Sequence, residues 1–233
     1  MRDTLNRDLI AAAWRNDVEA AARLIEEGAD VNAKDDTLQS AYLIATSEGF
    51  NSLLALTLDN GADVAAKDSY NGTGLIRAAE RGHAVTVGML IRAGIEIDHI
   101  NNLGWTALLE AIMLGDGGQR YADTVRVLLA SGADPSLPSQ GDGVFPLDHA
   151  TSRGFDVIAA SVRAAVDAAL PQDATAALFT AASNGDADGA MLALRAGADP
   201  AVRDAAGDTA LAIAARPGLR DVTRLLHAFT GPV

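Results

Sequence analysis

The chain has 233 residues, of which 49% are hydrophobic and 21% are charged, a composition typical of a folded protein rather than a disordered or collagen-like one. It has no cysteine, which excludes a disulfide framework, a thiolate metal site and a cysteine nucleophile. Its net charge of -13 argues against nucleic acid as a partner, because phosphate backbones are bound by cationic side chains.

The sequence lacks the marks of secretion and membrane insertion. Asp3, Asn6 and Asp8 interrupt any apolar run near the N-terminus, so no h-region of a secretory signal is present. No stretch approaches the roughly 18 apolar residues of a membrane span. We therefore expect no membrane span and a cytoplasmic protein, with a periplasmic or secreted location as the alternative if a signal was removed. Scarce lysine and abundant alanine favour a bacterial source.

The strongest signal is a repeated tripeptide. Gly-Ala-Asp begins at Gly28, Gly61, Gly132 and Gly197, and a variant, Gly-Ile-Glu, begins at Gly94. The first two spacings are 33 residues, and the third exceeds that period by a five-residue insertion. A fixed period in this range indicates a stacked repeat.

A second marker keeps the same phase and predicts the helices of each unit. It is clearest in Thr73-Gly-Leu-Ile and Thr106-Ala-Leu-Leu, where the threonine is suited to N-cap a short helix. A glycine in the left-handed conformation then ends that helix, and a second amphipathic helix runs to the next Gly-Ala-Asp. The turn residues between that tripeptide and the next cap predict a short hairpin finger. The glycines expected to end the first helices are Gly49, Gly82, Gly115, Gly154, Gly185 and Gly218.

In chain order, these signals predict seven helix-turn-helix units in one domain covering residues 1–233. Their approximate ranges are 4–33, 34–66, 67–99, 100–137, 138–170, 171–202 and 203–233. The sixth unit has no Gly-Ala-Asp before it, so we expect a soft joint at 164–174. Polar residues at the two ends, such as Arg220, Asp221 and Arg224, suit terminal units that turn one face to water.

These residues resemble the ankyrin-repeat family, whose pattern joins an Asp-x-x-Gly-x-Thr-Pro-Leu-His turn and helix to a second helix and Gly-Ala-Asp. The match is closest at 204–211 and 101–108, and it departs from the pattern in that proline occupies the second marker only at Pro146. The resemblance implies an all-α solenoid of about seven repeats, each contacting only its neighbours. It also implies a non-catalytic protein that binds another protein.

No residues point to catalysis, a metal or a cofactor. The four histidines, His83, His99, His149 and His227, fall in different repeats and at different phases, whereas a metal site needs ligands that converge. The glycine-rich stretches 115–118 and 141–143 lack the Lys-Ser/Thr pair of a phosphate-binding loop, and no Gly-x-Ser-x-Gly occurs. We therefore expect no enzyme activity and no cofactor.

The resemblance implies that finger tips and the exposed side of each first helix form a concave binding face. In the fourth repeat this face carries large apolar residues, which usually mark an interaction site. Trp105 is the anchor we expect, unless it packs on its own finger or under the inserted segment 116–121, which we expect to project. The candidate partner-binding residues are Tyr70, Arg81, Leu103, Trp105, Met113, Leu114, Val144 and Arg153.

Two functions remain open at this point. The first is a protein-binding scaffold or adaptor, acting as a monomer through the concave face centred on the fourth repeat. The alternative is an acidic regulatory or immunity-like protein that shields a partner enzyme electrostatically. Salt dependence separates them, because an electrostatically steered interaction weakens steeply with ionic strength and an apolar one does not.

Overall fold

The computed structural model describes residues 2–215 and 218–230, which form fourteen helices arranged as seven pairs. The first helices of the pairs are α1 (Arg2–Trp14), α3 (Ala41–Glu48), α5 (Gly74–Glu80), α7 (Ala107–Met113), α9 (Pro146–Ser152), α11 (Ala174–Asn184) and α13 (Ala210–Ala214). The second helices are α2 (Val18–Glu26), α4 (Asn51–Asp59), α6 (Ala84–Arg92), α8 (Gln119–Ala130), α10 (Asp156–Asp167), α12 (Ala187–Arg195) and α14 (Arg220–Thr230). The fold is the all-α repeat solenoid that the sequence predicts.

The first helices begin where the hydroxyl residues predict. Ser40, Thr73, Thr106 and Thr209 each accept a hydrogen bond from the backbone N–H three residues ahead, which satisfies a donor that the helix itself leaves unpaired. Most of the predicted terminating glycines have a positive φ. The exception is Gly115, where the left-handed residue is instead Gly117 inside the inserted segment.

The fingers are built on one acidic or amide side chain each. Asp35, Asp68, Asn101 and Asp204 each accept hydrogen bonds from the backbone N–H groups two and four residues ahead. This arrangement closes the turn locally and needs little β-pairing. Within the described residues the fingers carry only isolated bridges, such as that between Lys67 and Thr73.

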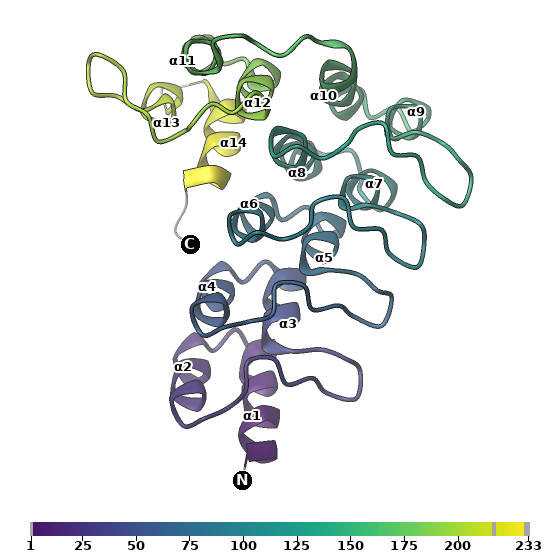
Figure 1. Ribbon diagram of the computed structural model, residues 1–233, viewed down its shortest axis with the longest axis vertical. Coiled ribbons are helices and arrows are strands. Elements are labelled where there is room, and N and C mark those ends of the chain that lie inside the picture. Colours follow the sequence, from purple (N-terminus) through teal and green to yellow (C-terminus); the bar gives the residue numbers. More distant parts are fainter. Residues whose placement is uncertain (1, 216–217, 231–233) are drawn as a thin grey trace.

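The first five pairs stack into a regular staircase. The first helices α1, α3, α5, α7 and α9 contact one another in order, and the second helices α2 to α10 form a parallel outer row. Figure 1 shows the fingers of these repeats projecting together on the side of the first helices. Neighbouring fingers are joined through their backbones, since Asn102 donates to the Tyr70 carbonyl and Gln140 to the Gly104 carbonyl.

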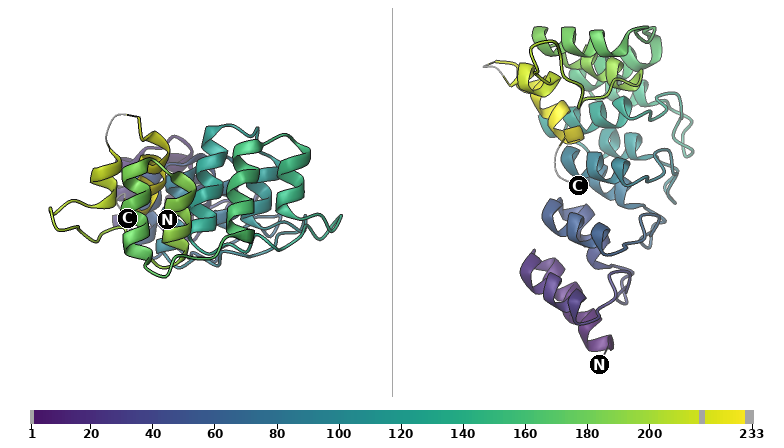
Figure 2. Two further views of the ribbon diagram at one scale, coloured as in Figure 1. Left: turned by 90° about the horizontal axis from the view of Figure 1, so that it is seen from above. Right: turned by 60° about the vertical axis from the view of Figure 1, so that its left-hand side comes forward.

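The chain reverses after α10, within the predicted joint. Residues 168–173 contain no helix, and the last two repeats then turn back against the outer row of the preceding ones (Figures 1 and 2). Besides its own partner α11, α12 packs mainly on α8, while α14 packs on α6 and α8. The expectation that each repeat contacts only its neighbours is therefore wrong for this chain, because second helices of distant repeats pack back to back.

Arginines form ion pairs and hydrogen bonds across the interface between the two blocks of the chain, the first five repeats and the last two. Arg126 of α8 is buried and places its Nε 2.8 Å from Asp188 of α12, and Arg224 of α14 places its Nε 2.6 Å from Asp123 of α8. Arg195 donates to the carbonyls of Leu129 and Ala133 at the end of α8. Arg224, which we expected to face water as part of a terminal cap, is 38% exposed and also pairs with Asp123 across the interface.

Candidate functional site

A groove opens on the inner face between the third repeat, residues 67–99, and the fourth, residues 100–137. Its volume is about 260 Å³. Three exposed apolar side chains stand along it: Tyr70 from one finger, Leu103 from the next, and Leu114 just after α7, with exposed fractions of 61%, 48% and 49%. The finger turns at Asp68 and Asn101 place Tyr70 and Leu103 at the exposed finger tips, and Leu114 is the residue that caps the C-terminus of α7.

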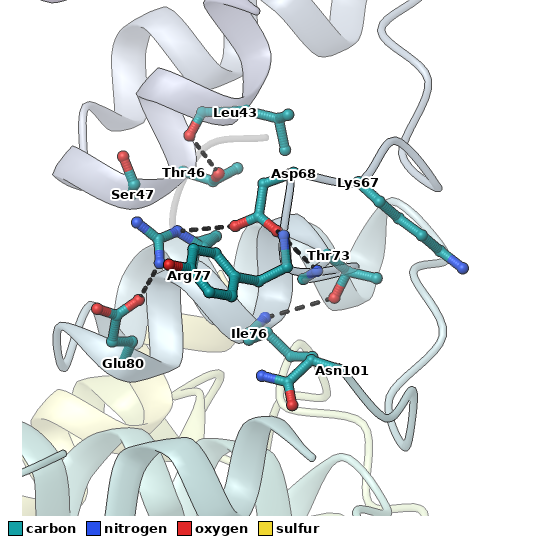
Figure 3. Close-up of polar contacts among 12 residues, drawn as sticks. Leu43, Thr46, Ser47, Lys67, Asp68, Thr73, Ile76, Arg77, Glu80 and Asn101 are labelled. Atoms are coloured by element: carbon teal, nitrogen blue, oxygen red, sulfur yellow. Dashed lines mark hydrogen bonds and ion pairs between the residues drawn. The ribbon is translucent and has the colours of Figure 1, made fainter. Parts of the chain in front are cut away.

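On the third-repeat side of the groove, acidic side chains are paired with an arginine (Figure 3). The guanidinium of Arg77 lies with its Nε 3.4 Å from Oδ2 of Asp68, and its Nη1 pairs with Glu80. Asp68 is buried and also accepts the N–H groups of Tyr70 and Gly72. This side of the groove therefore has its buried carboxylate paired with a cation of the same repeat.

The fourth-repeat side has a buried carboxylate without such a cation. Glu110 of α7 is 3% exposed, and its Oε1 accepts a hydrogen bond from the side-chain amide of Asn101. Its Oε2 is buried and has no hydrogen-bond partner among the described residues. Burial raises the pKa of Glu110 from its usual 4.5 to about 7, the Glu80 and Asp68 carboxylates add to the rise, and Asn101 and Arg77 oppose it.

Comparison with known proteins identifies the family to which this fold belongs. Family models of ankyrin repeats match residues 9–36 and, as three consecutive copies, residues 41–139. The ankyrin repeat protein YahD of Escherichia coli K12 is 38% identical over 137 residues, which cover 58% of this chain and 68% of YahD. The chain belongs to the ankyrin-repeat family.

Solved ankyrin structures agree with this assignment. A crystal structure of an ankyrin repeat domain from Acinetobacter baumannii AYE is 49% identical with a TM-score of 0.65, and the match covers 68% of this chain and 80% of that one. The crystal structure of the ankyrin repeat protein EF0377 is 37% identical with a TM-score of 0.62, covering 65% of this chain and 77% of that one. Ankyrin repeats are in general modules of protein–protein interaction, and ankyrin proteins are typically non-catalytic.

The ankyrin groove gathers three of the eight residues predicted for partner binding, Tyr70, Leu103 and Leu114. Trp105 and Met113 are half-buried beside it. The indole Nε1 of Trp105 donates to Oγ of Ser139, 3.1 Å away in the next finger. Trp105 therefore neither stands free nor packs only on its own finger, but joins the fourth and fifth repeats.

The remaining three predicted residues lie outside the groove. Arg81 places its Nη1 2.7 Å from Glu48 of the second repeat. Arg153 donates to the Gly115 carbonyl and lies over the ring of Phe155. Val144 is half-buried at the base of the fifth finger. The two arginines thus connect neighbouring ankyrin repeats while keeping part of their surface open to solvent.

The inserted segment 116–121 is exposed except at its last residue, Tyr121, and at the half-buried Gly117. Residues 116–118 form a turn, and residues 119–121 begin the second helix of the fourth repeat, α8, which has 12 residues where α4 and α6 have 9. Tyr121 is buried, and its hydroxyl donates to the carbonyl of Glu80. Tyr121 thus fixes the end of the insertion to the preceding ankyrin repeat.

A second cavity, of about 370 Å³, lies at the seam between the two blocks. Its walls include His83, Asp123 and Arg224. Arg224 and Asp123 already pair with each other, and a ring nitrogen of His83 lies 3.2 Å from the Ser47 carbonyl. Because these polar groups are used within the protein, the seam is less suited to a ligand than the ankyrin groove.

The described residues show neither a metal site nor a membrane helix. Among residues 2–215 and 218–230, no group of three or more His, Asp or Glu side chains is arranged to hold a metal ion. In the same ranges, every helix is too short or too polar to cross a membrane.

Sequence reasoning missed the polar residues of the groove, Asp68, Arg77, Asn101 and Glu110. A signal was present, because Arg77 and Glu110 occupy the same position of consecutive repeats, 33 residues apart, as do Asp68 and Asn101. The change from a positive charge at Arg77 to a negative charge at Glu110 identifies a position at which neighbouring repeats differ chemically. Comparing the repeats position by position would therefore have identified these four residues.

Proposed function

We propose that this ankyrin protein is a non-catalytic scaffold or adaptor that binds a protein partner through the groove between its third and fourth repeats. The observation that carries the proposal is the row of three exposed apolar side chains, Tyr70, Leu103 and Leu114, around one concave opening. Large apolar groups held in water on a rigid surface gain most when a partner covers them, and aromatic residues often anchor such contacts.

The proposed test removes this apolar row without touching the core. The variant carries Tyr70→Ser, Leu103→Ser and Leu114→Ser, and the control is Val157→Ser, which changes an equally exposed apolar residue on α10. Proteins retained by the immobilised wild type are identified by mass spectrometry. A partner that binds the wild type and the control but not the triple variant supports the proposal, while equal retention by all three proteins contradicts it.

The acidic alternative rests on a different observation, the net charge of -13. A shielding protein of this kind would bind its enzyme mainly by electrostatic attraction, and raising the salt concentration from 0.05 to ~0.5 M shortens the Debye length to a few ångströms. Loss of the partner in high salt, together with full binding by the triple variant, would favour this alternative. Binding through the apolar row should persist in the same salt.

A further inference from the structure

The unpaired oxygen of Glu110 is the feature of the groove that the fold does not account for. Glu110 lines the groove, is 97% buried, and leaves Oε2 without a hydrogen-bond partner among the described residues. A buried polar atom without a partner destabilises the folded state, and does so more strongly when it is charged. Oε2 is itself covered, but the Glu110 side chain lines an open cavity, so a small rotation of the carboxylate would present it to a donor that arrives from outside.

The preceding repeat shows what such a donor looks like. In the third repeat the finger supplies a carboxylate, Asp68, and the first helix supplies the guanidinium of Arg77 that pairs with it. At the same two positions of the fourth repeat stand Asn101 and Glu110, so the carboxylate has moved to the helix and its finger partner is a neutral amide. The pair in the fourth repeat therefore lacks a cation that its neighbour possesses.

The charges that line the groove also favour a cationic ligand. Its walls carry three carboxylates, those of Asp68, Glu80 and Glu110, and one guanidinium. That guanidinium belongs to Arg77, which is already engaged by Asp68 and by Glu80 and is not hydrogen-bonded to Glu110. A ligand cation thus enters a negative cavity that the protein itself compensates only in part.

We infer that the groove receives one basic side chain of the partner, a guanidinium or an ammonium group, which donates to Oε2 of Glu110. The apolar row of Tyr70, Leu103 and Leu114 then contacts the aliphatic stem of that side chain and the residues flanking it. This inference rests on the proposed function and adds the chemistry of the partner. A cavity of about 260 Å³ suits a single side chain, since clefts for whole small molecules start at roughly 300 Å³.

The test uses two small probes of the same shape on the full chain. One is n-butylguanidinium, which mimics an arginine side chain, and the other is neutral n-butylurea. Both are titrated at pH 8 and followed through the backbone amide signals of Tyr70, Gly72 and Leu103. The proteins compared are the wild type, Glu110→Gln, and Glu96→Gln, which removes one carboxylate charge at an exposed position outside the groove.

We expect the wild type to bind butylguanidinium ~10-fold or more tightly than butylurea, as a hydrogen bond to a charged group predicts. Glu96→Gln should keep that ratio, and Glu110→Gln should bring it close to one while its amide spectrum stays that of a folded protein. Equal binding of the two probes to the wild type, or no binding of either, would overturn the inference. So would loss of the ratio in Glu96→Gln, because the preference would then come from the general acidic surface.

The failure of this inference and the failure of the proposed function give different results. If partner capture requires the apolar row but the guanidinium preference is absent, the groove binds a protein, and the inference that it receives a cationic side chain is wrong. If the guanidinium preference depends on Glu110 but the apolar row is dispensable for partner capture, the cation site stands and the proposed docking face is wrong.

Discussion

Gly88 of α6 lies against the backbone of Ala228 in α14, so closely that a Cβ atom on Gly88 would stand 2.1 Å from the Ala228 carbonyl oxygen. The same carbonyl accepts a hydrogen bond from Nη1 of Arg92, at 2.6 Å. The residues are 140 positions apart in the sequence, yet they hold the last helix of the chain against the third repeat. A glycine at this place is what lets the two helices approach.

Gly88→Ala is therefore expected to destabilise the protein although alanine favours helices. The gain in helix propensity is about 1 kcal/mol, whereas overpacking a close contact costs about 1–3 kcal/mol and also separates Arg92 from its acceptor. Thermal unfolding followed by circular dichroism measures the net loss. Gly141→Ala is the control, because a methyl group there meets nothing nearer than the Ser139 hydroxyl oxygen at 3.9 Å. An unchanged midpoint in Gly88→Ala would show that the interface yields easily.

The buried pair of Arg126 and Asp188 gives a second prediction. Asp188 accepts hydrogen bonds from Arg126 and from the hydroxyl of Ser161, and the Arg126 side chain is 6% exposed. Asp188→Ala leaves that buried guanidinium with Asp221, 4.0 Å from its Nη1, as its remaining carboxylate, and breaking a buried pair in this way costs about 3–5 kcal/mol. Adding Arg126→Met should restore much of the stability, because the poorly compensated charge is then gone. Urea unfolding of the two single variants and the double variant measures this, and strict additivity would contradict the pairing.

The repeat unit was predictable from sequence because its determinants are local. Thr73 and Thr106 cap helices through their own hydroxyl groups, and Gly49 and Gly82 end helices through their own backbone conformation. Such interactions span a few residues and recur at a fixed period, so two markers in phase define the helix pairs. The reversal near residue 170 was visible only as a missing Gly-Ala-Asp.

The packing of the last two repeats was not predictable in the same way. It depends on contacts such as that of Gly88 with Ala228, and of Arg224 with Asp123, which join segments about 100 residues or more apart. No periodic pattern predicts which helix Arg224 contacts. From the sequence alone, the residue is therefore equally consistent with a solvent-exposed terminal cap. The buried state of Glu110 was hidden for a related reason, since a single carboxylate on a short helix is normally exposed.

Trp105 and Leu114 are expected to respond differently to substitution. Trp105 is half-buried and bonded to Ser139, so Trp105→Ala should lower the free energy of unfolding by ~2–3 kcal/mol, less than the 3–5 kcal/mol of a fully buried aromatic residue. Leu114 is 49% exposed, so Leu114→Ala should change stability by no more than about 0.5 kcal/mol while weakening partner binding. Thermal unfolding and partner capture on one preparation of each variant separate the two roles. A stable Trp105→Ala protein that no longer binds would return Trp105 to the role of exposed anchor.

The titration of Glu110 predicts how stability depends on pH. Its pKa in the folded protein is about 7, above the usual 4.5 that it regains on unfolding. Between these values the folded state holds a proton that the unfolded state releases, so raising the pH through this window favours unfolding. The free energy of unfolding should therefore fall by roughly 1–3 kcal/mol between pH 5 and pH 8 through this residue, the lower figure applying if water screens the groove.

Glu110→Gln removes this titration and keeps the shape of the side chain, so its stability should exceed that of the wild type by more at pH 8 than at pH 5. Urea unfolding of both proteins at half-unit pH steps measures the difference, and Glu96→Gln serves as the control because its carboxylate is exposed. A difference between Glu110→Gln and wild type that stays constant from pH 5 to 8 would place the pKa of Glu110 outside this range. The same proton also competes with a ligand cation for the Glu110 carboxylate, so butylguanidinium should bind the wild type more tightly at pH 8 than at pH 6. Glu110→Gln should lose this pH dependence of binding together with that of stability, because one carboxylate accounts for both.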